Sequence, residues 1–153
     1  MPAATVTSRT AGIRGAKELS ERLRALPRDV ANKLLGKAVK LGAAEIQQAI
    51  KRRTPIGRTR RLVRSVRNRR GRPRSPLEAR RFVGPSAPHA HLVEFGHVLV
   101  WKQPKTGRKY IKGHVPAHPF VRPGFTAGAP AAVNAIADSL GRTIPELATV
   151  RSS

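Results

Sequence analysis

The chain of 153 residues has the size of one domain, and its 31 Lys and Arg against 8 Asp and Glu give a formal net charge of +23. It has no Cys, which excludes a disulfide framework, a thiolate nucleophile and a Cys-based zinc site. No apolar run of about 18 residues occurs, so we expect a soluble protein that contacts no membrane.

Helical signals dominate the first third of the chain. After an N-terminal segment over 1–14, residues 16–53 combine strong helix formers with apolar residues spaced by three and four. Pro27 interrupts this region, so we expect a short helix before it and a long helix over 28–53. The long helix has to end before Pro55, because a residue that precedes proline disfavours the helical conformation.

The second half predicts short strands and a closing helix. Three stretches with strand character predict an antiparallel sheet: 62–67, 81–84 and 91–101. Within the strand and Pro-rich region 82–125, residues 102–113 have the composition of a hairpin tip, and prolines hold 115–125 extended. An apolar stripe predicts a C-terminal helix over 130–147. We therefore expect one α+β domain over 1–153, with a long N-terminal helix packed on a small antiparallel sheet.

The Arg-rich junction and arm, residues 54–81, is the most basic region. Residues 51–81 hold fourteen Lys and Arg and one acidic residue. Because Arg binds phosphate oxygens bidentately, nine arginines are candidate contacts to DNA or to an acidic partner: Arg58, Arg60, Arg61, Arg64, Arg67, Arg69, Arg70, Arg72 and Arg74. A solvated loop without a partner is an equally weighted interpretation. The segment has no aromatic residue, so any nucleic-acid contact would be made to the backbone and be independent of sequence.

Motifs for catalysis or cofactor binding are missing from the sequence. There is no GxSxG and no glycine-rich phosphate loop, and the acidic residues are too few and scattered for an acid–base pair. The five histidines lack thiolates and have little carboxylate support, so polar or packing roles are favoured over a metal site. We expect no enzymatic activity, no cofactor and no metal.

Three short motifs occur in order between the two predicted long helices. They are Pro55, Thr59, Leu62 and Ser65; VEFG at 93–96, in a predicted strand; and PFVRP at 119–123. From about Gly15 to Leu147 the chain resembles the tail-completion or head–tail joining family of long-tailed bacteriophages, the lambdoid minor tail component family. The family's Gly after Thr is Arg60 here, so we expect the turn to be made at Gly57 instead.

The resemblance implies a structural virion protein that catalyses no reaction. Proteins of this kind form a ring in the phage neck, and genomic double-stranded DNA passes along its axis. The implied partners are further copies of the chain, the head-side connector or head-closing protein, and the tail terminator or tail tube protein. Six copies are favoured by tail symmetry and twelve are allowed on the head side. The implied location is the virion neck, after assembly in the bacterial host cytoplasm.

A closed ring requires two different patches on each subunit. Candidate interface residues are aromatic and proline side chains: Trp101, Tyr110, Pro116, Pro119 and Phe120. Core packing is an equal alternative for Trp101 and Phe120. Glu94 is an acid among apolar neighbours and needs a partner, so we expect an ion pair with Arg122 that anchors the Pro-rich segment.

A second function stays open at this point. The protein could be a free-standing, sequence-independent nucleic-acid-binding protein that uses residues 51–81. That function predicts a steep fall of affinity with salt, whereas the neck function predicts ring-shaped oligomers.

Overall fold

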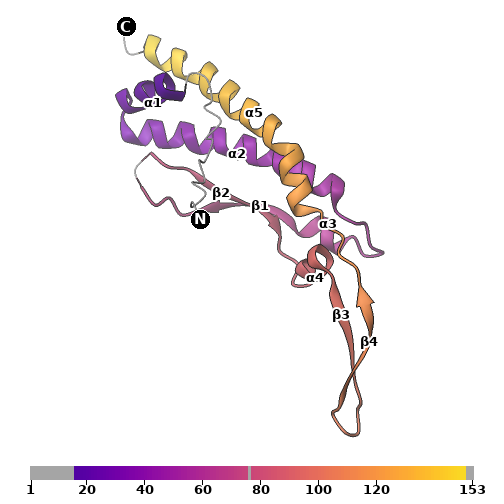
Figure 1. Cartoon of the computed structure of the whole chain (residues 1–153). Coiled ribbons are helices and arrows are strands. Elements are labelled where there is room, and N and C mark those ends of the chain that lie inside the picture. The colour runs from indigo at the N-terminus through magenta and orange to yellow at the C-terminus, as the bar shows by residue number, and fades with distance from the viewer. Residues whose placement is uncertain (1–15, 76, 151–153) are drawn as a thin grey trace, which may run out of the picture.

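The molecule consists of a layered body and a projecting hairpin (Figure 1). The structure is a computed structural model that describes residues 16–75 and 77–150, so the segment expected over 1–14 lies outside the described residues. In the body, one long helix packs against a second long helix and against a two-stranded ribbon. These helices and small antiparallel sheets confirm the predicted α+β class.

The N-terminal helices occupy the predicted residues. α1 (Ala16–Ala25) and α2 (Arg28–Arg53) are separated at Pro27, which cannot continue a helix from α1. Thr54 ends α2, because its backbone leaves the helical conformation and its Oγ1 donates a hydrogen bond to the carbonyl of Ile50 at 2.8 Å. The three basic residues in the last turn of α2 favour the negative end of its dipole.

α5 (Val121–Val150) runs back along α2 in the opposite direction (Figure 1). Small residues let the two helices approach closely. A Cβ at Gly124 would lie 2.7 Å from the Cα of Ile50, and a Cβ at Gly128 would lie 2.9 Å from the Cβ of Ala49. No ordinary side chain fits at such distances, so the glycines set the spacing of the pair.

The closing helix begins nine residues earlier than the sequence predicted. The segment expected to stay extended over 115–125 becomes helical at Val121, and the helix continues beyond 147 to Val150. Pro123 is compatible with this start, because the first N–H groups of a helix have no intrahelical partner to lose.

β1 (Val66–Gly71) and β2 (Arg80–Pro85) form the ribbon on α2, paired antiparallel from Val66↔Pro85 to Gly71↔Arg80. Residues 66–71 of the predicted junction and arm therefore form a strand. The strand expected over 62–67 is wrong over 62–65, because α3 (Arg61–Ser65) precedes β1 there. Ser65 Oγ donates to the carbonyl of Leu62 at 2.7 Å, which satisfies a backbone group in this single turn.

The turn before α3 differs from the expectation at Gly57. Arg60 donates its N–H to the carbonyl of Gly57 at 3.0 Å, so the turn does span these residues. The residue in the left-handed region, however, is Arg60, with φ of 51°. Arg60 thus holds a conformation that a glycine would adopt without strain, at the position where the resemblance led us to expect glycine.

α4 (Ala90–Phe95) occupies residues that were predicted as part of one strand over 91–101, and VEFG begins in this helix. Gly96, with φ of 72°, ends the helix and starts β3 (His97–Lys102). β3 pairs antiparallel with β4 (Lys109–Val115) and forms the hairpin that extends from the body (Figure 1). The hairpin tip predicted over 102–113 is confirmed over 103–108, with Gly107 in the left-handed region of the loop, whereas 109–113 belong to β4.

Candidate functional site

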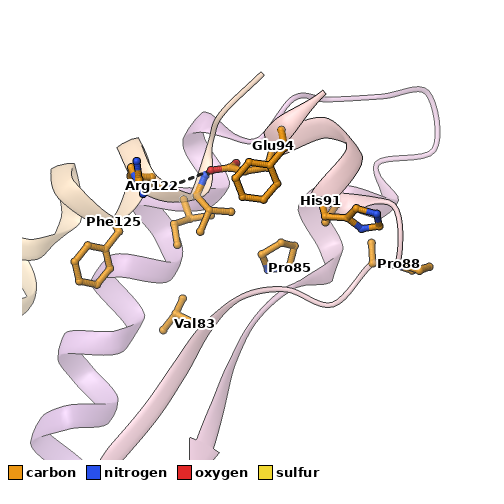
Figure 2. A pocket seen from close by; sticks show the side chains of 12 residues that line it. Val83, Pro85, Pro88, His91, Glu94, Arg122 and Phe125 are labelled. Carbon is orange, nitrogen blue, oxygen red and sulfur yellow. Dashed lines mark hydrogen bonds between the residues drawn. The ribbon is translucent and has the colours of Figure 1, made fainter. Parts of the chain in front are cut away.

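An apolar groove lies where the end of β2, α4 and the start of α5 meet (Figure 2). Its volume is near 740 Å³. Apolar side chains from the strand, the helices and the intervening loop line it: Val83, Pro85, Pro88, Phe95, Val121 and Phe125. Phe95 and Phe125 remain 78% and 54% exposed, although aromatic rings bury large areas where a partner is available. Residues 16–75 and 77–150 leave this apolar surface uncovered.

Glu94 lies at the groove and caps α5. Its Oε2 accepts hydrogen bonds from the backbone N–H groups of Phe120 at 2.7 Å and Val121 at 3.0 Å, and its Oε1 accepts one from Arg122 at 3.3 Å. The positive end of the helix dipole favours a carboxylate here. Desolvation raises the pKa of Glu94, but the three hydrogen bonds and the charge of Arg122 outweigh it and lower the pKa overall. An ionised Glu94 therefore ties α4 to α5.

The ion pair expected between the side chains of Glu94 and Arg122 is not formed, and the backbone cap takes its place. Among the described residues, the guanidinium of Arg122 forms no salt bridge with Glu94, and the contact is made by its backbone N–H. The side chain of Arg122 acts at longer range, through its charge. A second link holds the Pro-rich segment to α4, since His118 donates its N–H to the carbonyl of Val93 at 2.8 Å.

The β3–β4 hairpin is a second uncovered apolar surface. Its pairing places three apolar side chains on each face: Leu99, Trp101 and Tyr110 on one, and Val98, Val100 and Ile111 on the other. All six are between 43% and 77% exposed. The rings of Trp101 and Tyr110 lie 5.9 Å apart between centroids, and the Lys112 Nζ lies 5.3 Å from the Trp101 ring. A ribbon that is apolar on both faces has no side turned to a core of its own.

Four of the five predicted interface residues are exposed. Trp101 and Tyr110 lie on the hairpin, and Pro116 and Pro119 lie in the strand-to-helix segment after it. Phe120 is different: its exposed fraction is 0%, because it directly precedes α5 and packs in the main core cluster. The interface role predicted for Phe120 is therefore wrong, and its core alternative holds.

The nine candidate arginines are all exposed but do not form one arm. They are distributed over the turn before α3, α3 itself, β1 and the loop after β1. Side chains alternate along β1, where Val66 is buried and Asn68 bonds to α2. Arg67 and Arg69 therefore face away from α2, whereas Arg70 faces toward it.

Arg70 belongs to a second groove that sequence reasoning missed. The groove has a volume near 510 Å³, and its cations come from α2 and both strands of the ribbon: Lys33, Lys37, Lys40, Arg70 and Arg81. We call this the basic groove. The signal was the helical spacing of the three lysines, but its meaning depended on recognising residues 66–71 as a strand that packs on α2.

The histidines have no shared site in the described part of the chain. His91 lines the apolar groove, and the ring of His97 has its Nδ1 3.4 Å from the carbonyl oxygen of Leu92. Between residues 16 and 150, leaving out 76, no three His, Asp or Glu side chains gather where they could hold a metal ion. No helix in that part of the chain is long and apolar enough to span a bilayer.

Comparison with known protein families gives a match over the N-terminal part of the chain. Residues 17–96 match the family model described as "Bacteriophage HK97-gp10, putative tail-component". This match runs from α1 through Gly96 and covers more than half of the chain. The matched part, from α1 to the end of α4, thus has the sequence pattern of a bacteriophage tail component. The chain is a member of the HK97-gp10-like family of phage tail components. No curated protein and no solved structure matches it significantly.

Proposed function

We propose that the protein forms a closed ring in the phage neck, which joins the DNA-filled head to the tail. Membership of a phage tail-component family supports a structural role in the virion. The observation that carries the ring is the presence of two different uncovered apolar surfaces on one chain, the hairpin and the groove between α4 and α5. A ring closes through a heterologous contact, in which one patch meets a different patch on the neighbour. The hairpin of one copy accordingly packs in the apolar groove of the next.

The two-faced hairpin also provides a surface for other neck proteins. If one apolar face fills the neighbouring groove, the other face stays available for the head-side connector or head-closing protein, or for the tail terminator or tail tube protein. Trp101 and Tyr110 on one face and the exposed Pro116 and Pro119 nearby suit such contacts, since aromatic anchors dominate interfaces. Six copies match the symmetry of the tail.

The alternative is a free-standing nucleic-acid-binding protein. The exposure of all nine candidate arginines favours it, because each guanidinium is accessible to phosphate. The two functions differ in oligomeric state. A neck protein assembles into rings through which DNA passes, whereas a free-standing binder requires no closed assembly.

The test is the mass and shape of the purified protein by native mass spectrometry and negative-stain electron microscopy. We expect rings for the natural sequence and their loss in Ile111→Asp and Phe95→Ser, which alter the hairpin and the groove. Leu41→Ser is the matched control, because Leu41 is 52% exposed on α2, outside both surfaces, so rings should persist. A protein that stays monomeric at high concentration and in the virion would refute the proposal.

A further inference from the structure

Two elements far apart in the sequence form the basic groove. The cross-strand pair Arg70↔Arg81 lies on the face of the ribbon that is turned toward α2. Next to this pair, the Asn68 Nδ2 donates to the carbonyl of Lys40 at 3.5 Å and holds the ribbon against the helix. Gly36 lines the groove on the helix side, and a Cβ there would meet nothing within 4 Å. The groove is therefore open along its helical wall.

Positive charge in the basic groove is largely uncompensated. Its five cations face one lining carboxylate, that of Asp29. The next carboxylate, Glu78 in the loop between the strands, is already engaged. It accepts hydrogen bonds from the backbone of Arg74 and Ser75 and from the side chain of Arg80. A ligand in the groove would therefore meet an excess of cations.

The arrangement is unfavourable for the chain alone. Lys33 and Lys37 are like charges four residues apart on a helix, which destabilises the helix slightly. Arg70 and Arg81 are like charges directly opposite each other in an antiparallel pair, which is also destabilising. Both repulsions converge on one groove, and a bound polyanion removes both.

The geometry selects a class of polyanion. From Lys33 to Lys40 the lysines extend over about 10 Å of the helix axis, and duplex DNA carries one charge per roughly 1.7 Å of its own axis. Arg70 and Arg81 supply planar forks that bind phosphate oxygens. No aromatic side chain lines the groove, so it lacks the aromatic platform on which single-strand binders stack unpaired bases.

We propose that the basic groove binds the phosphate backbone of double-stranded DNA, independently of base sequence. The inference rests on the proposed function, which brings genomic DNA through the assembled ring, and it identifies the surface that meets that DNA. It moves the contact from the Arg-rich segment alone to a composite surface in which α2 contributes three of the five cations.

The experiment is a salt titration of the full chain binding a fluorescein-labelled DNA duplex of mixed sequence, followed by anisotropy between about 50 and 200 mM salt. The variant combines Lys33→Gln, Lys37→Gln and Lys40→Gln, which keeps good helix formers at exposed positions. We expect the slope of log affinity against log salt to become shallower by about 3, and affinity at about 0.1 M salt to fall by 10² to 10³.

The matched control removes the same charge from the end of the hairpin, through Lys105→Gln and Arg108→Gln in the loop and Lys109→Gln at the start of β4. These residues are exposed and lie outside the basic groove. We expect a salt slope close to that of the natural sequence. Equal losses in the two triple variants would show that only net charge matters, and would overturn the proposal.

A steric variant tests the groove without changing its charge. Gly36→Leu places a side chain in the open space of the groove, and we expect roughly tenfold weaker DNA binding with the melting temperature kept or raised. Unchanged DNA binding in a folded Gly36→Leu variant and in the lysine triple variant would refute the site. Loss of binding to poly-glutamate without loss of DNA binding would assign the groove to an acidic protein and also refute it. A monomer that binds DNA through the groove would contradict the proposed ring and leave this inference standing.

Discussion

The α2–α5 pair and the β3–β4 hairpin solve the burial of apolar residues in opposite ways. In the helical pair, glycines bring the backbones so close that Gly124 approaches the Cα of Ile50, and side chains from both helices enter the two core clusters. In the hairpin, six apolar side chains on two faces stay exposed, and the strands pack mainly on each other.

This difference separates folding from assembly within one chain. Apolar area removed from water within the body stabilises the fold at about 25 cal/mol per Å². Apolar area on the hairpin contributes little until another molecule covers it. Substitutions in the helical pair should therefore change the free energy of unfolding, whereas substitutions in the hairpin should change assembly.

The largest loss of stability is expected for Phe120→Ala. Phe120 is fully buried at the junction of α2, β1 and α5, and truncating a buried Phe leaves a cavity. The free energy of unfolding in urea should fall by about 3–5 kcal/mol. A loss below about 1 kcal/mol would mean that this junction is not the centre of the core.

The glycine spacing of the helices predicts the next effect. In Gly124→Ala the new Cβ would lie 2.7 Å from the Cα of Ile50, so the helices must move apart, and stability should fall by about 1–3 kcal/mol. Gly141→Ala is the control on the same helix. Nothing lies within 4 Å there, so it should stabilise by about 0.5–1 kcal/mol in the same urea measurement. Equal effects at both positions would contradict close packing of α2 on α5.

Glu94→Gln tests the hydrogen bonds that link α4, at the base of the hairpin, to the start of α5. The amide cannot accept all three hydrogen bonds as a carboxylate does, so stability at neutral pH should fall by about 1–2 kcal/mol. The pKa of Glu94 is lower in the folded protein than in the unfolded chain, so the stabilisation is fully present above the unfolded pKa and is lost as the pH falls through the folded pKa.

The difference in unfolding free energy between the natural sequence and Glu94→Gln should therefore shrink on acidification. Asp138→Asn is the control, an acid-to-amide change at an exposed position of α5, and it should show little effect at either pH. A difference that stays constant between pH 7 and about pH 3 would rule out a charged cap.

The smallest effect on folding is expected in the hairpin. Ile111 is 77% exposed, so Ile111→Ser should change the free energy of unfolding of the single chain by no more than about 0.5 kcal/mol. The same variant should weaken ring assembly in native mass spectrometry. A large loss of stability without loss of assembly would show that the hairpin contributes to folding and not to assembly.

The sequence predicted elements whose cause is local. α1 and α2 match the expected helices because their signals are local. The apolar periodicity lies within the helices, and Pro27 and Pro55 lie just beyond their ends. β2 was likewise predicted from the short apolar stretch at 81–84, and β3 from the Val- and Leu-rich end of 91–101. β4 was missed, because most of its residues were assigned to the hairpin tip. The family also followed from local motifs, and residues 17–96 confirm it.

The remaining elements depend on contacts between distant residues. α5 starts at Val121 because the carboxylate of Glu94, on another helix, satisfies its first N–H groups. β1 forms in an Arg-rich stretch because β2 supplies its hydrogen-bond partners, and the basic groove exists because that ribbon lies on α2. Apolar composition around Val93 suggested a strand, but tertiary context overrode this weak propensity and made α4.

Gly96 sets the direction in which the hairpin leaves the body. A Cβ at this position would lie 2.7 Å from the carbonyl oxygen of Val115 and 2.9 Å from the nitrogen of Ala117, so the outgoing and returning segments are in backbone contact here. In a ring built by hairpin-to-groove contacts, this contact would fix the rotation from one subunit to the next. A small angular error would be multiplied at every step, and the assembly would grow as an open spiral instead of closing. In such a ring, the close backbone contact at Gly96 would govern the curvature of the assembly.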